Sequence, residues 1–242
     1  TALKLSCNIP FAELGIALGQ EAIAAQAKKF GFGESVAIPM KSTASVYPEG
    51  MDAAQTGLSS FGQFDVRVSP LQMLMVSAAI ANGGIEMQPY LVDQIFTSNL
   101  TLLQETKPTE IRRSISTSTS EALKNMMVMA VSSGVSSNAS IPGVVVAGKT
   151  GTAENGVGEP YTLWFTGFAP AKNPRYVAVL MVSQGGFGAS TSGYGVRKIY
   201  ETLFGVKGGK VDPAASLFPS GKPPVKLPKI SPATRPAGEK KK

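Results

Sequence analysis

The sequence predicts an α+β domain in which helices flank an antiparallel sheet. Helical patterns precede residue 134 and return near the end of the body, while three extended runs lie together between them. The second and third runs are joined by Pro-Ala-Lys-Asn-Pro, and a connection this short makes neighbouring strands antiparallel. Helices that come before and after a block of strands are typical of α+β architecture rather than of a doubly wound sheet.

Two helices are predicted in the first third of the chain. Residues 11–30 are rich in Ala, Leu, Ile and Gln and are followed by Gly31, a common residue type just past a helix end. A second helix is predicted over 71–81, because Ser69 and Gln72 match a capping box with a proline at the first helical position. An Asn-Gly-Gly sequence then ends that helix.

The remaining elements follow in chain order. A second capping box, Ser118 with Glu121, predicts a helix that continues to Gly134. The period then becomes extended, which predicts strands over 144–153, 162–169 and 175–183. A closing helix carries an apolar stripe that could cover one face of the sheet, formed by Val196, Ile199, Tyr200, Leu203 and Phe204.

The composition removes several classes of active site. The chain has no histidine, so it can form neither a Ser-His-Asp triad, nor a Cys-His pair, nor a His-ligated zinc site. Its single cysteine allows no internal disulfide and no thiolate metal cluster. Any catalysis must use Ser, Thr, Lys, Tyr or carboxylate side chains.

The net charge of +7 comes from the C-terminal end of the chain. Residues 1–205 carry equal numbers of basic and acidic side chains, whereas 206–242 are rich in lysine and proline. We therefore expect a folded domain over 1–205 that does not bind nucleic acid, followed by a disordered basic tail over 206–242. This tail either solubilises the protein or contacts an anionic membrane or wall polymer. No apolar run approaches the roughly 18 residues of a membrane span.

The first segment that suggests chemistry is Lys149-Thr150-Gly151-Thr152, at the end of a predicted strand. The lysine ammonium and the threonine hydroxyls can hold a carboxylate, Gly151 lets another backbone approach, and an exposed strand edge can pair with a peptide. The alternative interpretation of these residues is a strand that runs into a polar turn.

The second segment is Ser6-Cys7-Asn8, after the short amphipathic stretch Leu3-Lys4-Leu5. A serine and an asparagine two residues apart suit a loop that presents a hydroxyl and an amide to one ligand. By itself the tripeptide is also typical of an ordinary helix end or turn.

Together, SxN followed far downstream by KTGT resembles the penicillin-binding protein transpeptidase family. Other segments agree in order: Phe61-Gly62-Gln63 resembles the family's GQ segment, and 164–170 resembles the strand that follows KTG. The resemblance covers residues 1–205 and is nearest to monofunctional class B enzymes of actinobacterial type. It implies a fold like that of serine β-lactamases and transpeptidases.

The resemblance also implies residue roles. Ser6 would relay protons to and from the leaving group, with Lys149 supplying positive potential and a hydrogen bond to Ser6. Asn8 would hold the acyl-side amide of the ligand. Thr150 and Thr152 would bind the substrate carboxylate, and the Thr152 N–H would be one oxyanion donor. The Gly-Gln pair at 62–63 is expected only to shape a loop.

One family motif is missing from the sequence. The nucleophile and its lysine belong to an SxxK motif upstream of SxN, and here no serine stands three residues before any lysine. We therefore expect a C-terminal part of a transpeptidase, inactive by itself, whose partner is the missing N-terminal part of the same protein. That part would supply the early strands, so its absence would leave an open sheet edge and exposed apolar surface.

The activity implied by the resemblance is peptidoglycan D,D-transpeptidation through a serine ester, with no cofactor. The ligands would be the peptidoglycan stem peptide and β-lactam antibiotics. The whole protein would act at the outer face of the cytoplasmic membrane, tethered only by an N-terminal anchor.

Two alternatives to the transpeptidase stay open. A D,D-carboxypeptidase or a β-lactamase-like hydrolase could use the same motifs but would need a deacylating base, for which no motif is found. A non-catalytic penicillin-binding-like module would be favoured if these residues were the whole protein.

Overall fold

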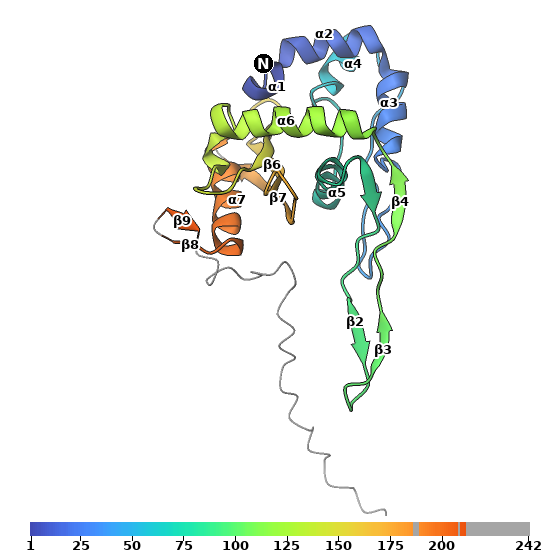
Figure 1. The fold of residues 1–242 in the computed structure, drawn as a ribbon. Coiled ribbons are helices and arrows are strands. Elements are labelled where there is room, and N and C mark those ends of the chain that lie inside the picture. The colour runs from blue at the N-terminus through green and yellow to red at the C-terminus, as the bar shows by residue number, and fades with distance from the viewer. Residues whose placement is uncertain (186–188, 208, 212–242) are drawn as a thin grey trace, which may run out of the picture.

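A computed structural model describes residues 1–185, 189–207 and 209–211 of the protein (Figure 1). Its helices are α1 Ala2–Leu5, α2 Asn8–Leu18, α3 Gln20–Lys29, α4 Ala53–Ser59, α5 Pro70–Ala81, α6 Thr117–Ser133 and α7 Ala189–Leu203, with a 3₁₀ turn at Ser137–Ala139. Its strands are β1 Ile85–Met87, β2 Gln94–Phe96, β3 Leu102–Glu105, β4 Glu110–Arg113, β5 Ala147–Ala153, β6 Tyr161–Ala169, β7 Tyr176–Gly185, β8 Val206–Lys207 and β9 Lys210–Val211.

The three strands predicted after residue 134 form one antiparallel sheet in the order β5-β6-β7. The first strand begins at Ala147 rather than at Val144, because Val144 forms an isolated bridge with Ile141 in the preceding turn. Since β5 pairs only with β6 among the described strands, its other edge is open to a pocket. The sheet therefore presents the KTG segment on an outer strand.

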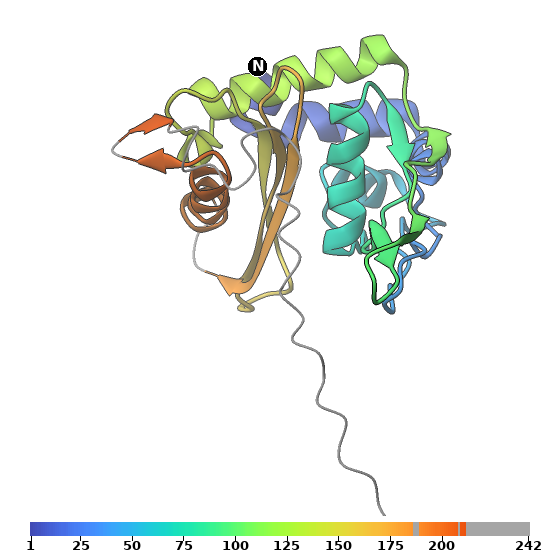
Figure 2. The same ribbon diagram turned by 60° about the horizontal axis from the view of Figure 1, so that its bottom comes forward.

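Helices cover both faces of this sheet, as the sequence predicts. Figure 2 shows the sheet between α7 on one side and α5 on the other, with α6 running across both. One apolar core joins the sheet to α7 through Phe165, Val196 and Tyr200, and a second joins it to α5 and α6 through Phe168 and Met127. Phe165 and Phe168 of β6 lie on opposite faces, because successive side chains of a strand alternate.

Two details of the predicted helices are wrong. Residues 11–30 form two helices instead of one, because the chain turns at Gly19 with φ +80°, a conformation that glycine adopts without strain. The helix predicted from Ser118 is capped by Ser116, whose hydroxyl accepts the Thr119 N–H. The 71–81 helix is confirmed, with Ser69 as its cap.

The four short strands between α5 and α6 were not predicted from the sequence. β1 pairs antiparallel with β4 beside α5, and β2 pairs antiparallel with β3 in an arm that extends away from the body in Figure 1. All residues of β3 are exposed, so burial imposes no apolar alternation that a sequence pattern could reveal. This arm lies outside the candidate site.

The C-terminal prediction falls mostly outside the described residues. Residues 206–207 and 210–211 form the small pair β8–β9, and residues 208 and 212–242 of the predicted tail are not described. Within the described part of the chain, no helix is both long and apolar enough to cross a membrane.

Candidate active site

Ser6 lies in the turn between α1 and α2, in the left-handed conformation with φ 54° and ψ 43°. Such a backbone is uncommon for a residue other than glycine and often occurs at functional positions. The turn is anchored to the end of α6 because Val135 N–H donates to the Lys4 carbonyl at 3.1 Å. Gly134 permits this approach, since a Cβ there would lie 2.4 Å from the same carbonyl oxygen. This anchoring places the Ser6 hydroxyl beside β5.

Lys149 of β5 meets that hydroxyl directly. Its Nζ donates to Ser6 Oγ at 2.7 Å and to the Thr150 carbonyl at 2.6 Å. Burial lowers the pKa of the Lys149 ammonium from 10.5 to about 8. A lysine with a pKa in this range can hold positive charge in the site and can also exchange a proton with a bound hydroxyl near neutral pH.

Ser136 contacts Thr150 of β5, a contact that the sequence did not predict. The buried Ser136 hydroxyl accepts the Thr150 N–H at 3.1 Å and lies 3.3 Å from the Thr150 hydroxyl. Thr150 is itself only 8% exposed. Of the two threonines predicted to bind a carboxylate, Thr152 is therefore the more accessible. The serine-rich sequence after α6 gave no signal for this contact, which depends on tertiary packing.

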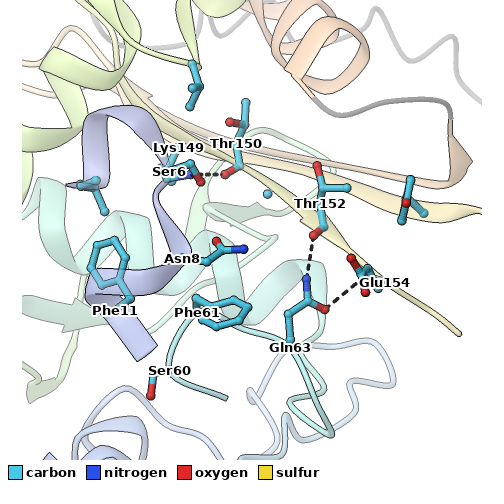
Figure 3. Close-up of a pocket in the computed structure, with 14 residues that line it drawn as sticks. Ser6, Asn8, Phe11, Ser60, Phe61, Gln63, Lys149, Thr150, Thr152 and Glu154 are labelled. Carbon is cyan, nitrogen blue, oxygen red and sulfur yellow. Dashed lines mark hydrogen bonds between the residues drawn. The ribbon is translucent and has the colours of Figure 1, made fainter. Parts of the chain in front are cut away.

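Gln63 is the second residue whose contacts were missed. Its Nε2 donates to the Thr152 carbonyl at 3.0 Å, and its Oε1 accepts the Glu154 N–H at 3.2 Å (Figure 3). The loop reaches β5 because α4 packs closely on α2, where a Cβ at Gly15 would lie 1.6 Å from the Ser60 hydroxyl. The GQ segment therefore contacts the sheet edge as well as forming a loop.

A pocket of about 560 Å³ lies beside β5. All six residues singled out from the sequence are part of its wall: Ser6, Asn8, Lys149, Thr150, Gly151 and Thr152. In Figure 3 Asn8 points into the pocket on the side of Phe11 and Phe61. A polar strand edge thus faces an apolar wall, which suits a ligand with a peptide backbone and an apolar part.

The fold and the site define an α+β domain that holds a lysine–hydroxyl pair at an open sheet edge. No group of three or more His, Cys, Asp or Glu side chains that could bind a metal occurs in residues 1–185, 189–207 and 209–211. The family model for the penicillin binding protein transpeptidase domain matches residues 1–205. The chain therefore belongs to the penicillin-binding protein transpeptidase family, and the class predicted from SxN and KTG is confirmed.

Curated relatives give the same result. The chain is 38% identical over 196 residues to "Peptidoglycan D,D-transpeptidase PbpA" of Mycolicibacterium smegmatis, a match that covers 79% of this chain and 40% of that protein. It is 32% identical to "Stage V sporulation protein D" of Bacillus subtilis, over 73% of this chain and 29% of that protein. The chain thus spans less than half the length of these relatives.

Solved structures confirm the fold. The imipenem acyl-enzyme complex of penicillin-binding protein A from Mycobacterium tuberculosis is similar with a TM-score of 0.76 and 35% identity, covering 82% of this chain and 45% of that one. The D,D-transpeptidase domain of a peptidoglycan glycosyltransferase from Eggerthella lenta is similar with a TM-score of 0.75 and 30% identity. This match covers 84% of this chain and 52% of that one.

Proposed function

We propose that this chain is the substrate-binding and proton-relay part of a peptidoglycan D,D-transpeptidase. The observation that carries the proposal is the hydrogen bond from Lys149 to Ser6 across the pocket at the open edge of β5. Similarity to named D,D-transpeptidases and to β-lactam acyl-enzyme structures supports it. β-Lactams then act on the same site as analogues of the acyl donor.

The nucleophilic serine in this proposal belongs to an SxxK segment outside these 242 residues. Support comes from the sequence, which contains no serine three residues before a lysine. Further support comes from β7, which pairs only with β6 among the described strands, and from exposed apolar side chains on α2 that another segment could cover. The exposed α2 residues are Ile9, Leu14, Ile16 and Leu18.

The proposed reaction is acyl transfer in two steps. The serine oxygen bonds to the carbonyl carbon of the penultimate D-Ala, the C–N bond to the last D-Ala breaks, and the serine proton passes to the departing amine. To form the cross-link, an amine of a neighbouring stem then bonds to the ester carbonyl carbon, the C–O bond to the serine breaks, and a proton of the amine returns to the serine oxygen. Ser6 and Lys149 relay the proton, because the lowered pKa of Lys149 suits it to both donate and accept.

The other pocket residues bind the donor. The Thr152 N–H points away from β6, on the same side as its carbonyl, and serves as an oxyanion donor. The Thr152 hydroxyl takes the terminal carboxylate, and Asn8 holds the acyl-side amide. Gly151 leaves the edge free for a close backbone approach.

The whole protein would act outside the cytoplasmic membrane, where stem peptides are exposed. The test uses the complete gene product, incubated with a fluorescent penicillin and then with a D-Ala-D-Ala donor and an amine acceptor. We expect a covalent penicillin adduct on a serine of the SxxK segment and amine-containing product from the peptide. Absence of an adduct would refute the proposal. If the donor is hydrolysed and no amine-containing product forms, the activity is instead that of a D,D-carboxypeptidase.

The matched variants are Lys149→Ala and Lys172→Ala. Lys172 lies exposed in the turn between β6 and β7, away from the pocket lining. We expect the Lys149 variant to be acylated on the order of 10² more slowly, as for loss of one electrostatic contact in a buried site, and the Lys172 variant to be acylated normally.

A further inference from the structure

The open edge of β5 offers few free backbone groups to a ligand. At Thr150 both outward groups are engaged, because its N–H donates to Ser136 and its carbonyl accepts from Lys149. An extended peptide therefore cannot pair with β5 at Thr150 without breaking one of these contacts. Pairing must begin at the next outward-facing residue, Thr152.

Beyond Thr152 the edge is closed by a side chain. The Gln63 amide donates to the Thr152 carbonyl and accepts from the Glu154 N–H, at 3.0 and 3.2 Å. One residue of a parallel neighbouring strand would make the same pair of bonds, an N–H to one carbonyl and a C=O from the N–H two residues on. The Gln63 side chain thus occupies the place of a peptide unit on this edge.

The Thr152 N–H is the group left over. It points to the same side as the Thr152 carbonyl, and it donates to no acceptor among the described residues. The carbonyl keeps a second lone pair, so one ligand amide can still pair with Thr152 while Gln63 stays in place. The edge therefore accommodates one residue of an extended ligand.

We propose that Gln63 determines specificity by ending the peptide-binding edge of β5 at Thr152. The proposal rests on the proposed function, because it concerns the acyl donor of that reaction. The donor pairs with β5 only at its reacting residue, and the chain before that residue turns away from the strand. Phe11 and Phe61, which line the same pocket, offer the apolar surface over which it turns.

Gln63→Ala in the complete gene product tests this. Two donors are compared: an N-acyl-D-Ala-D-Ala, and the same peptide lengthened by two residues at its amino end. In the wild type the extension should change acylation efficiency less than threefold, because Gln63 keeps it off the strand. In the variant the longer donor should gain about tenfold over the shorter one, the size expected from one or two added strand hydrogen bonds. Gln104→Ala, an exposed change on β3, should leave both donors unaffected.

Two results would overturn the proposal. If Gln63→Ala loses acylation efficiency equally with both donors, Gln63 aligns β5 and does not limit how far the donor pairs with this strand. If the two donors acylate the variant in the same ratio as the wild type, the donor does not compete with Gln63 for the edge of β5. Gln63→Leu keeps the side-chain volume and removes both hydrogen bonds, so it repeats the test if the alanine variant folds poorly.

Amide hydrogen exchange separates this proposal from the proposed function. The Glu154 N–H should exchange faster in Gln63→Ala than in the wild type, and adding the longer peptide should slow it again only in the variant. This measurement needs peptide binding but no acylation. If no donor acylates any protein and yet this exchange pattern is found, the proposed function fails while the role of Gln63 stands.

Discussion

Replacing Lys149 by methionine should stabilise the domain while it removes activity. The drop of its pKa from 10.5 to about 8, at about 1.4 kcal/mol per unit, makes the charged ammonium about 3 kcal/mol less favourable in the folded protein. Losing its hydrogen bonds to Ser6 and Thr150 offsets about 2 kcal/mol of this. At pH 7 we expect Lys149→Met to unfold about 2–4 °C higher, a gain of about 1 kcal/mol for a domain of this size.

The difference in stability between the wild type and Lys149→Met should depend on pH, and this dependence tests the explanation by burial. Because burial lowers the folded-state pKa of a cation, wild-type stability is reduced below about pH 8 and recovers as the pH rises from there to 10.5. The advantage of Lys149→Met in thermal melts should therefore shrink over that range. Penicillin acylation of the same variant should fall by about 10²–10³. A variant that melts lower at pH 7, or an advantage that does not change with pH, would refute the burial argument. Lys172→Met, on the exposed turn, is the matched control.

Four further outcomes are expected. Gly148→Ala should destabilise the domain by about 1–3 kcal/mol in thermal melts, because its Cβ would lie 2.2 Å from the Phe165 ring. Gly15→Val should separate α2 from α4, because an added Cβ would lie 1.6 Å from the Ser60 hydroxyl, and should lower penicillin acylation as well as the melting temperature. Deleting 213–242 should leave melting temperature and penicillin binding of the complete protein unchanged, and a loss of several degrees would contradict the tail boundary. The 242-residue chain alone should show no penicillin adduct by intact mass spectrometry, whereas adding an SxxK segment should restore one on a serine of that segment.

The sheet and the residues at its edge could be predicted because they leave local signals. Each signal is local: every β-branched run, the short turn between two of them and the polar Lys-Thr-Gly-Thr segment can be recognised within a few adjacent residues. The break at Gly19 was harder to predict, because the residues on both sides favour helix and only a positive φ marks the turn. The short strands β2 and β3 have no buried residue and so show no apolar period, and the buried residue of β1, Glu86, is polar.

The contacts of Gln63 and Ser136 could not be predicted for a different reason. Gln63 lies 89 residues before its partner Thr152, and neither side chain differs in type from many that contact only water. Such a contact depends on how α4 packs against α2 and not on any local pattern. Resemblance marked the GQ segment as notable, but it gave no reason to place an amide on the strand edge.

The motifs Ser-Cys-Asn and Lys-Thr-Gly-Thr supply reactive groups, but their meeting depends on glycines elsewhere. Gly134 lets α1 rest on the end of α6, Gly15 lets the loop after α4 reach β5, and Gly148 makes room for Phe165 under the strand. At each position an added Cβ would lie closer than 3 Å to another atom, so a larger residue would push one wall of the pocket outward. A sequence that kept both motifs and lost these glycines should therefore lose the 2.7 Å contact between Lys149 and Ser6. The motif residues and the packing residues must both be present, because proton relay through a hydroxyl fails when the donor and acceptor move apart by even an ångström or so.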